Sequence, residues 1–129
     1  MTDEVLQAAD DLVAAFGDGR LDDYFAAFAS DATFVFHTTR ERISSTAEYR
    51  ALWQRWVAED DFRVLDCVST NRLVQQFGDT AVFSHDVRTT VSTALGRETL
   101  AERETIVFHR EGSGRWLAVH EHLSPASGT

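Results

Sequence analysis

The second half of the chain is the feature that most limits what this sequence can fold into. From Phe62 to Leu123, runs rich in β-branched and aromatic residues are broken by three turn signals, Gly78-Asp79, Leu95-Gly96-Arg97 and Gly112-Ser113-Gly114. This pattern predicts three or four long strands, and the short turns make neighbouring strands antiparallel. With 129 residues and 43% hydrophobic side chains, we expect one domain over residues 1–129 with its core between 3 and 125.

The first half of the chain shows helical spacing. Apolar side chains recur every three or four positions over residues 3–17 and again, over a shorter stretch, over residues 21–28. The segment ATFVFH at 32–37 is short and aromatic and predicts a strand. Ser45 and Glu48 form a capping-box pattern ahead of a broad apolar stripe, which predicts a third helix. The expected fold class is therefore α+β, with N-terminal helices packed on a curved antiparallel sheet.

Charge and cysteine content exclude several classes of function. The net charge is −9, from 21 acidic and 12 basic residues, and every basic residue is an arginine. Such a chain is unsuited to nucleic acid and to anionic membranes. We see no apolar run near the roughly 20 residues of a membrane-spanning helix, and no targeting segment. The lone Cys67 excludes an internal disulfide, so we expect a cytoplasmic protein.

The turn at Gly96 suggests how polar side chains line up across the sheet. If the strands pair about Gly96, Arg88 faces Glu104, Glu104 lies beside Glu121, and Asp86 points to the same side. The same face is expected to carry Ser84, Ile106, Phe108, Val119 and Leu123. The opposite face, with His85, Arg103, His120 and His122, is also partly apolar, so we expect helices to cover one face and a second subunit the other.

The segments FASDATFVF after the second helix and GRWLAVHEHLS at the end, with this order of elements, resemble the nuclear transport factor 2-like superfamily. Within it the chain looks most like SnoaL-like polyketide cyclases, ketosteroid isomerases and the association domain of calcium/calmodulin-dependent kinase. The resemblance implies a cystatin-like cone around an apolar pocket. This fold hosts isomerases, dehydratases, cyclases and plain binding modules, so it does not select a function.

Two departures from these relatives bear on the chemistry. The position of the ketosteroid isomerase general base is occupied by Phe36, which cannot accept a proton, whereas the oxyanion-hole acid of those enzymes matches Glu104. One pocket arginine of the kinase association domain matches Arg88, but its other arginines fall on Ile106 and Leu123. The resemblance therefore implies neither steroid isomerisation nor the association domain's binding pattern.

Glu104 and Glu121 are the leading candidates for chemistry. Two adjacent carboxyl groups beneath apolar side chains cannot both ionise cheaply, so at least one pKa should rise, and such a group can act as general acid or base near neutral pH. Arg88 and Asp86 could orient a ligand, and His37 could carry a proton at the pocket rim. The expected ligand-binding residues around them, most of them apolar, are Tyr24, Phe34, Phe36, Trp53, Trp56, Ser84, Ile106, Phe108, Val119 and Leu123. The alternative is a cross-strand ion pair between Arg88 and Glu104 that only fixes register.

Three hypotheses follow. The first is a homodimer whose subunits each bind a small apolar or polycyclic ligand and act on it without cofactor, as an isomerase, cyclase or dehydratase. The second is a non-catalytic module that binds or oligomerises through the sheet face bearing His85, Arg103, His120 and His122. The third is a metal site at His120, His122 and His85; the nearest carboxylates on that face are missing and Arg103 stands among the imidazoles, so we expect no metal.

Overall fold

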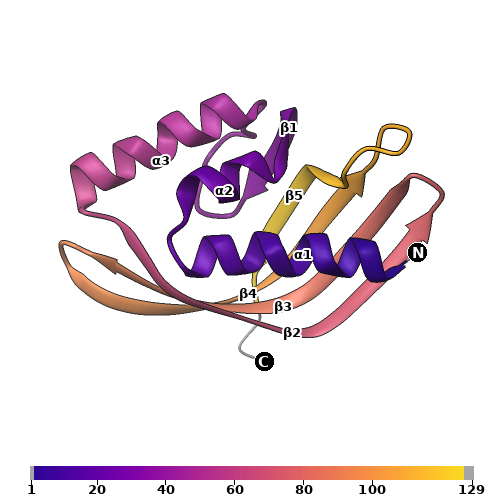
Figure 1. Cartoon of the computed structure of the whole chain (residues 1–129). Helices are drawn as coiled ribbons and strands as arrows, with labels where there is room; N and C mark the ends of the chain where they lie inside the picture. The colour runs from indigo at the N-terminus through magenta and orange to yellow at the C-terminus, as the bar shows by residue number, and fades with distance from the viewer. Residues whose placement is uncertain (1, 127–129) are drawn as a thin grey trace.

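The structure, a computed structural model, describes residues 2–126. Its helices all lie on one face of a strongly curved five-stranded sheet (Figure 1). The elements are α1 (Thr2–Gly17), α2 (Leu21–Ala26), β1 (Phe28–Phe36), α3 (Thr46–Asp60), β2 (Arg63–Phe77), β3 (Thr80–Thr93), β4 (Gly96–His109) and β5 (Leu117–Pro125). The predicted α+β class, with helices packed on a curved sheet, is confirmed.

The sheet order is β1-β5-β4-β3-β2. Strands β2, β3, β4 and β5 pair antiparallel with one another, as the turn signals predicted, and β1 joins the edge parallel to β5. β1 begins at Phe28, earlier than the predicted 32, because Phe28 pairs with Ala118 of β5. This tertiary pairing also shortens α2, which ends at Ala26 rather than at 28.

Local sequence signals set the ends of α3. Ser45 is its N-cap, and its hydroxyl accepts a hydrogen bond from the Glu48 backbone N–H at 3.1 Å. The Glu48 carboxylate accepts in turn from the backbone N–H of Ser44 at 2.9 Å, one residue before the cap. Asp61 ends the helix in the left-handed conformation, with φ of 52°. These ends fix where the aromatic stripe of α3 meets the sheet.

The predicted register of β3 on β4 is wrong. The loop between them is Ala94-Leu95, with Thr93 paired to Gly96, so Glu104 faces His85 and Arg88 faces Ala101. The prediction centred the turn on Gly96 and so displaced the pairing by three residues. Because side chains alternate between faces, an odd displacement assigns every β3 side chain to the wrong face.

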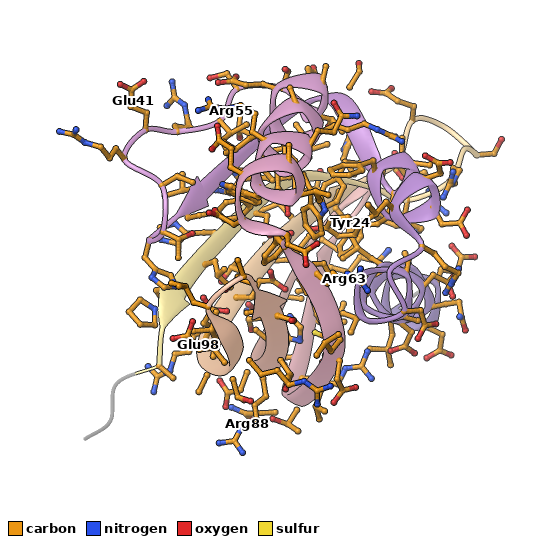
Figure 2. All side chains as sticks on the ribbon, turned by 90° about the vertical axis from the view of Figure 1, so that its left-hand side faces the viewer. Tyr24, Glu41, Arg55, Arg63, Arg88 and Glu98 are labelled. Carbon is orange, nitrogen blue, oxygen red and sulfur yellow. The ribbon has the colours of Figure 1, made fainter. Side chains whose placement is uncertain are left out.

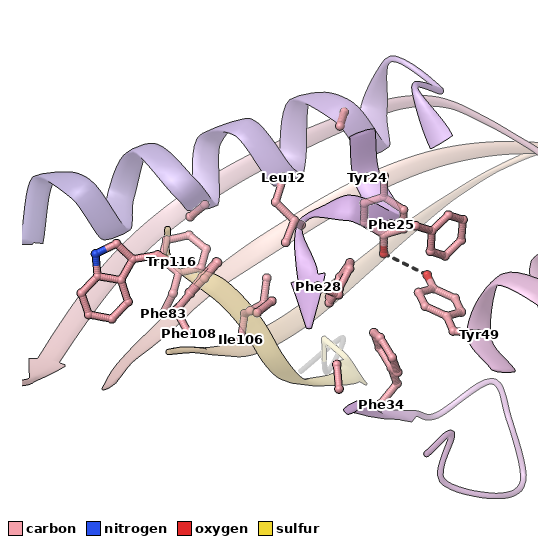
Figure 3. Packing of buried hydrophobic residues seen from close by; sticks show 14 of the residues in the cluster. Leu12, Tyr24, Phe25, Phe28, Phe34, Tyr49, Phe83, Ile106, Phe108 and Trp116 are labelled. Atoms are coloured by element: carbon pink, nitrogen blue, oxygen red, sulfur yellow. Dashed lines mark hydrogen bonds between the residues drawn. The ribbon is translucent and has the colours of Figure 1, made fainter. Parts of the chain in front are cut away.

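The core is dominated by aromatic rings held between α2, β1 and α3 (Figure 3). Tyr49 packs against Phe34 with centroids 4.6 Å apart and against Phe25 at 5.2 Å. Phe34, Phe83, Ile106 and Phe108 are fully enclosed. Burying rings of this size against one another fixes α3 over the sheet.

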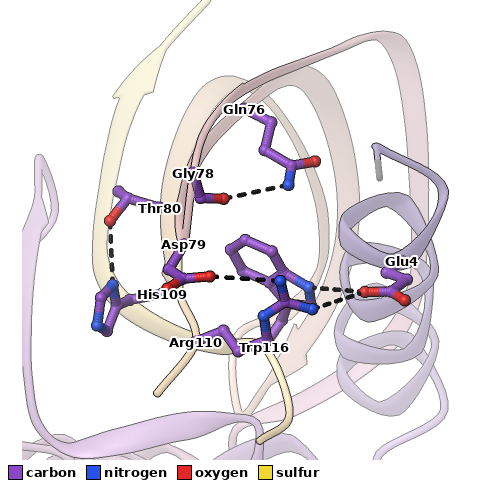
Figure 4. A network of polar contacts seen from close by, with 8 residues as sticks. All are labelled: Glu4, Gln76, Gly78, Asp79, Thr80, His109, Arg110 and Trp116. Atoms are coloured by element: carbon purple, nitrogen blue, oxygen red, sulfur yellow. Dashed lines mark hydrogen bonds and ion pairs between the residues drawn. The ribbon is translucent and has the colours of Figure 1, made fainter. Parts of the chain in front are cut away.

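A polar network closes the domain at the amino-terminal end of α1 (Figure 4). The Arg110 guanidinium donates to Glu4 at 3.0 Å and to Asp79 at 3.3 Å, and it lies 4.9 Å from the ring centroid of Trp116. The Trp116 indole N–H also donates to Glu4, at 3.3 Å. These contacts join α1, the β2–β3 turn and the segment before β5.

Candidate functional site

A cavity of about 300 Å³ lies between the helices and the concave face of the sheet. We take the mouth of the cavity to lie where the end of α3 meets the β3–β4 hairpin. The exposed lining residues Asp60 and Glu98 lie there, and the Ala94 N–H donates to the Asp60 carbonyl at 2.7 Å. Figure 2 views the molecule from this end. The walls are mainly apolar and aromatic: Leu12, Val13, Phe16, Tyr24, Phe36, Tyr49, Trp53, Trp56, Phe62, Val87, Val91, Leu100 and Leu123.

Three glutamates meet on the concave face inside this cavity. Glu102 and Glu104 are two residues apart on β4 and so share a face, and Glu121 lies on the neighbouring strand β5. Glu121 is only 3% exposed. Burial, the charge of Glu104, a hydrogen bond with Glu104 and the charge of Glu102 raise the pKa of Glu121 well above its ordinary value. The raised pKa favours the protonated form of Glu121 beside Glu104.

Glu121 also has an unused acceptor. Its Oε1 is buried and has no hydrogen-bond partner within residues 2–126. An unpaired buried carboxyl oxygen costs free energy that a protein usually avoids. In this cavity a ligand donor could satisfy it.

Histidine side chains contact two of the three glutamates, Glu104 and Glu102. His85 Nε2 lies 2.6 Å from Glu104 Oε1, and its Nδ1 lies 2.6 Å from the Ser69 hydroxyl. When Glu104 is ionised, Nε2–H donates to it, and the neutral ring then accepts from Ser69 at Nδ1. His37 Nε2 lies 2.5 Å from Glu102 Oε2. These contacts hold Glu104 and Glu102 in fixed orientations, much as outer partners orient catalytic groups elsewhere.

Two tyrosines form the polar part of the helical wall. The hydroxyls of Tyr24 and Tyr49 lie 2.9 Å apart and are buried. Burial first, and then the charge of Glu121, raises the pKa of both phenols well above the ordinary value, so both stay neutral. Their mutual hydrogen bond uses one of the two O–H protons, which leaves the other free to donate to a ligand.

Cys67 lines the cavity but is not activated. Burial raises the pKa of its thiol to about 12, against a smaller opposing effect of the hydrogen bond from Thr89, whose hydroxyl lies 3.7 Å from the sulfur. The thiolate is the nucleophilic form, so Cys67 serves as wall here and not as nucleophile.

Seven of the predicted site residues line this cavity. They are Glu104, Glu121, Tyr24, Phe36, Trp53, Trp56 and Leu123. Phe34, Ile106 and Phe108 belong to the closed core and do not line it. His37 does not line it either, but it contacts the cavity acid Glu102.

Four other predicted site residues lie elsewhere. Asp86, Arg88 and Ser84 point to the convex face of the sheet because the predicted register was wrong. Asp86 accepts a hydrogen bond from the Asn71 amide at 3.3 Å there, and Figure 2 shows Arg88 pointing away from the cavity. Val119 is the extra residue of a β-bulge between β4 and β5.

The same correction reveals residues that the sequence reasoning did not place at the site. His85 moves from the convex to the concave face, where it supports Glu104, and Val87 and Thr89 follow it. Glu102, Tyr49 and Phe62 also line the cavity or contact its acids. Reading Ala94-Leu95 as a two-residue hairpin loop would have found the β3 residues.

The predicted histidine cluster is not assembled. His85 is on the concave face, whereas His120 and His122 pair with Val107 and Thr105 on the convex face. Within residues 2–126, no three His, Cys, Asp or Glu side chains form a group that could hold a metal ion. The expected dimer face accordingly keeps Arg103, His120 and His122 but loses His85.

Comparison with known proteins identifies the family. The profile of the SnoaL-like domain matches residues 5–128, nearly the whole chain. The chain belongs to the SnoaL-like domain family. No curated protein matches it in sequence. Within the described residues, no helix is both long enough and apolar enough to cross a membrane.

Solved structures similar to this SnoaL-like domain agree on the fold. An NTF2-like protein of unknown function in nutrient uptake from Rhodospirillum rubrum has a TM-score of 0.80 and 20% identity, over 95% of this chain and 98% of the other. The CaMKII hub from S. rosetta has a TM-score of 0.77 and 22% identity, over 96% and 95%. An NTF2-like protein from Cytophaga hutchinsonii has a TM-score of 0.79 and 14% identity, over 98% of each chain. At these identities the likeness shows the fold alone.

Proposed function

We propose that this SnoaL-like domain is a cofactor-independent acid–base enzyme, an isomerase, cyclase or dehydratase that acts on a small, largely apolar molecule. The observation that supports this most is the buried Glu121 carboxyl, which lies diagonally across from Glu104 at the wall of an aromatic cavity. A positioned carboxyl with a raised pKa suits proton transfer near neutral pH.

The proposed chemistry divides the work between the two acids. Ionised Glu104 takes a proton from carbon next to a carbonyl, and the C–H electron pair forms the new C=C bond of an enol. Protonated Glu121 delivers its proton to the carbonyl oxygen as the C=O π bond breaks. The spare hydroxyl proton of the Tyr24–Tyr49 pair supports the same oxygen. With a β,γ-unsaturated ketone, the enol is a dienol; Glu104 returns the proton to the far carbon of the dienol, and as the C=O bond re-forms the enol O–H proton passes back to ionised Glu121, which completes the isomerisation.

Exchange of the α-protons of 2-tetralone in D₂O, followed by NMR, tests this reading. The compound is apolar and bicyclic, and its exchange requires only proton removal and return. We expect wild-type exchange above the buffer rate, with at least a hundredfold loss in Glu104→Gln and in Glu121→Gln. Glu111→Gln, at an exposed acid far from the cavity, is the matched control and should exchange like wild type. Equal rates in wild type and Glu104→Gln would refute the proposal.

A second candidate function is oligomerisation through the convex face of the sheet. Val68, Leu73 and Phe77 of β2 are 46%, 54% and 66% exposed there. Exposed apolar side chains on a sheet face favour a protein partner, and one similar structure, from S. rosetta, is named a CaMKII hub. We propose a homodimer across Arg103, His120 and His122. Sedimentation should show a dimer in wild type and a monomer in Val107→Glu, while Leu95→Glu at the fully exposed hairpin tip stays dimeric.

A further inference from the structure

The charge of the cavity lining has one sign. Five carboxyl side chains line it, and of the described lining residues none is Arg, Lys or His. The five are Asp60, Glu98, Glu102, Glu104 and Glu121. We infer that the ligand of this cavity carries a positively charged nitrogen on an apolar, ring-bearing body. This deepens the proposed function, on which it rests for the use of the cavity, but it is tested by binding alone.

The buried acid Glu121 presents an unpartnered acceptor to the cavity. Glu121 is 3% exposed, and its Oε1 has no hydrogen-bond partner within residues 2–126. Glu104 lies beside it and is partly exposed to the cavity. A ligand ammonium supplies N–H donors and positive charge together, whereas a ligand carboxylate would add a further negative charge to this cluster.

The basic groups near these acids do not cancel the excess negative charge of the cavity lining. With Glu121 protonated, four lining carboxyls remain; His37 and His85 contact Glu102 and Glu104, and two imidazolium charges would offset at most two of the four. Arg63 at the start of β2 and Arg97 at the start of β4 are exposed and do not line the cavity. The tyrosines stay neutral, because burial raises the pKa of each phenol. A net negative field therefore remains inside.

The mouth adds to this field. α3 ends there, and a helix carries partial negative charge at its carboxyl end. The last turn of α3 has no basic side chain to offset that charge, and Asp60 contributes a carboxylate. A cation approaching the mouth is attracted, and an anion is repelled.

The aromatic wall suits an organic cation better than a metal ion. Trp53, Trp56 and Phe62 pack together near the mouth, with centroids 5.1 Å apart for Trp53 and Phe62 and 5.6 Å for Trp56 and Phe62. Ring faces attract ammonium groups within about 6 Å and also bury apolar carbon. The described acids do not form a group suited to a metal, so the charge is left for a larger ligand.

Isothermal titration with three ligands that share a naphthylmethyl body tests the inference. The ligands are 1-naphthylmethylamine, a cation at pH 7, 1-naphthalenemethanol, which is neutral, and 1-naphthylacetate, an anion. We expect the amine to bind at least tenfold more tightly than the alcohol, and the acetate to bind most weakly. Equal or tighter binding of the alcohol or the acetate would overturn the inference.

Variants assign the preference to the cavity acids. Glu102→Gln combined with Glu104→Gln should weaken the amine at least tenfold and the alcohol less than threefold. Because those positions are buried, the exposed pair Asp60→Asn and Glu98→Gln provides a variant with little risk to folding, and it should weaken the amine alone by about threefold to tenfold. Glu111→Gln should change neither ligand. An amine preference that survives both cavity variants would also contradict the inference.

The two proposals fail separately. Tight amine binding without any 2-tetralone exchange would leave a cation-binding domain that is not an acid–base enzyme. If 2-tetralone exchange depends on Glu104 but the amine is not preferred, the proposed enzymatic activity stands and the inference of a cationic ligand is wrong.

Discussion

Glu104 and Glu121 are diagonal neighbours on the concave face: Glu104 pairs with Leu123 across the β4–β5 ladder, and Glu121 pairs with Ile106. Diagonal positions on adjacent strands lie within reach of long side chains. The two carboxyl groups therefore lie close enough to interact, and burial, together with the charge of Glu104, raises the pKa of Glu121. The pair couples the stability of the fold to the chemistry proposed for it.

Glu121→Gln should stabilise the protein at neutral pH. A carboxyl whose pKa is higher in the folded than in the unfolded chain contributes its stability fully below the unfolded value of about 4.3 and loses it as pH rises through the folded pKa. Glutamine keeps the donor to Glu104 and cannot ionise. We expect the free energy of unfolding of the variant to exceed that of wild type by on the order of 1 kcal/mol at pH 8, and the excess to vanish near pH 4.

Urea unfolding at pH 4, 6 and 8 measures this difference. Subtracting the two proteins at each pH removes the pH dependence that they share. Glu41→Gln, at an exposed carboxyl with no side-chain hydrogen bond or ion pair within residues 2–126, is the control and should differ little from wild type at all three pH values. A variant that is less stable than wild type at pH 8 would show that the ionised Glu121 is favoured by the fold.

Ser69→Ala should impair Glu104 through His85. The Ser69 hydroxyl fixes the ring of His85, which in turn donates to Glu104, so the serine is a positioning residue. We expect a threefold to tenfold loss of kcat for 2-tetralone exchange, a displaced pH profile and little change in KM. Ser69→Thr keeps the hydroxyl and should restore the profile, which a purely structural role would not require. An unchanged profile in Ser69→Ala would remove His85 from the site.

The sequence predicted the elements better than it predicted the site. Turn glycines and the Ser45 cap are local signals, and α3 and the four long strands appear where those signals placed them. The register of β3 depends on where a two-residue loop falls between Thr93 and Gly96, and local propensity does not decide that. Because of this one displacement, the prediction put Arg88 at the site in place of His85. The prediction that Glu104 and Glu121 share one face of the sheet agrees with the β4–β5 pairing.

Tyr24 and Tyr49 should be energetically coupled. Each buried hydroxyl has the other as a partner at 2.9 Å, so removing one leaves the other without it. We expect Tyr24→Phe and Tyr49→Phe each to lower the free energy of unfolding by about 1–2 kcal/mol, and the double variant to cost about 1 kcal/mol less than the sum. Chemical denaturation of the four proteins gives this coupling. Strict additivity would mean that the two hydroxyls do not interact in solution.

Arg110→Ala should destabilise the fold, whereas Arg88→Ala should not. Arg110 joins Glu4, Asp79 and the Trp116 ring, and its side chain is 26% exposed. Screening by solvent limits the ion pairs, so we expect a loss of about 1–2 kcal/mol, mostly from packing. Arg88 is exposed on the convex face, and its replacement should stay within about 0.5 kcal/mol and leave ligand binding unchanged. Loss of ligand binding in Arg88→Ala would contradict the register described above.

Cys67 should resist alkylation in the folded protein. Burial raises the pKa of its thiol to about 12, so at pH 8 the thiolate fraction is about a thousandfold smaller than in the unfolded chain. Iodoacetamide labelling followed by intact-mass measurement should therefore proceed at least about a hundredfold faster in 8 M urea than in buffer. Thr89→Val removes the hydrogen bond that favours the thiolate and should slow labelling of the folded protein further. Rapid labelling without urea would mean that the Cys67 thiol is solvated or lies beside a positive charge. That result would contradict the placement of Cys67 in the wall of a cavity lined by carboxylates.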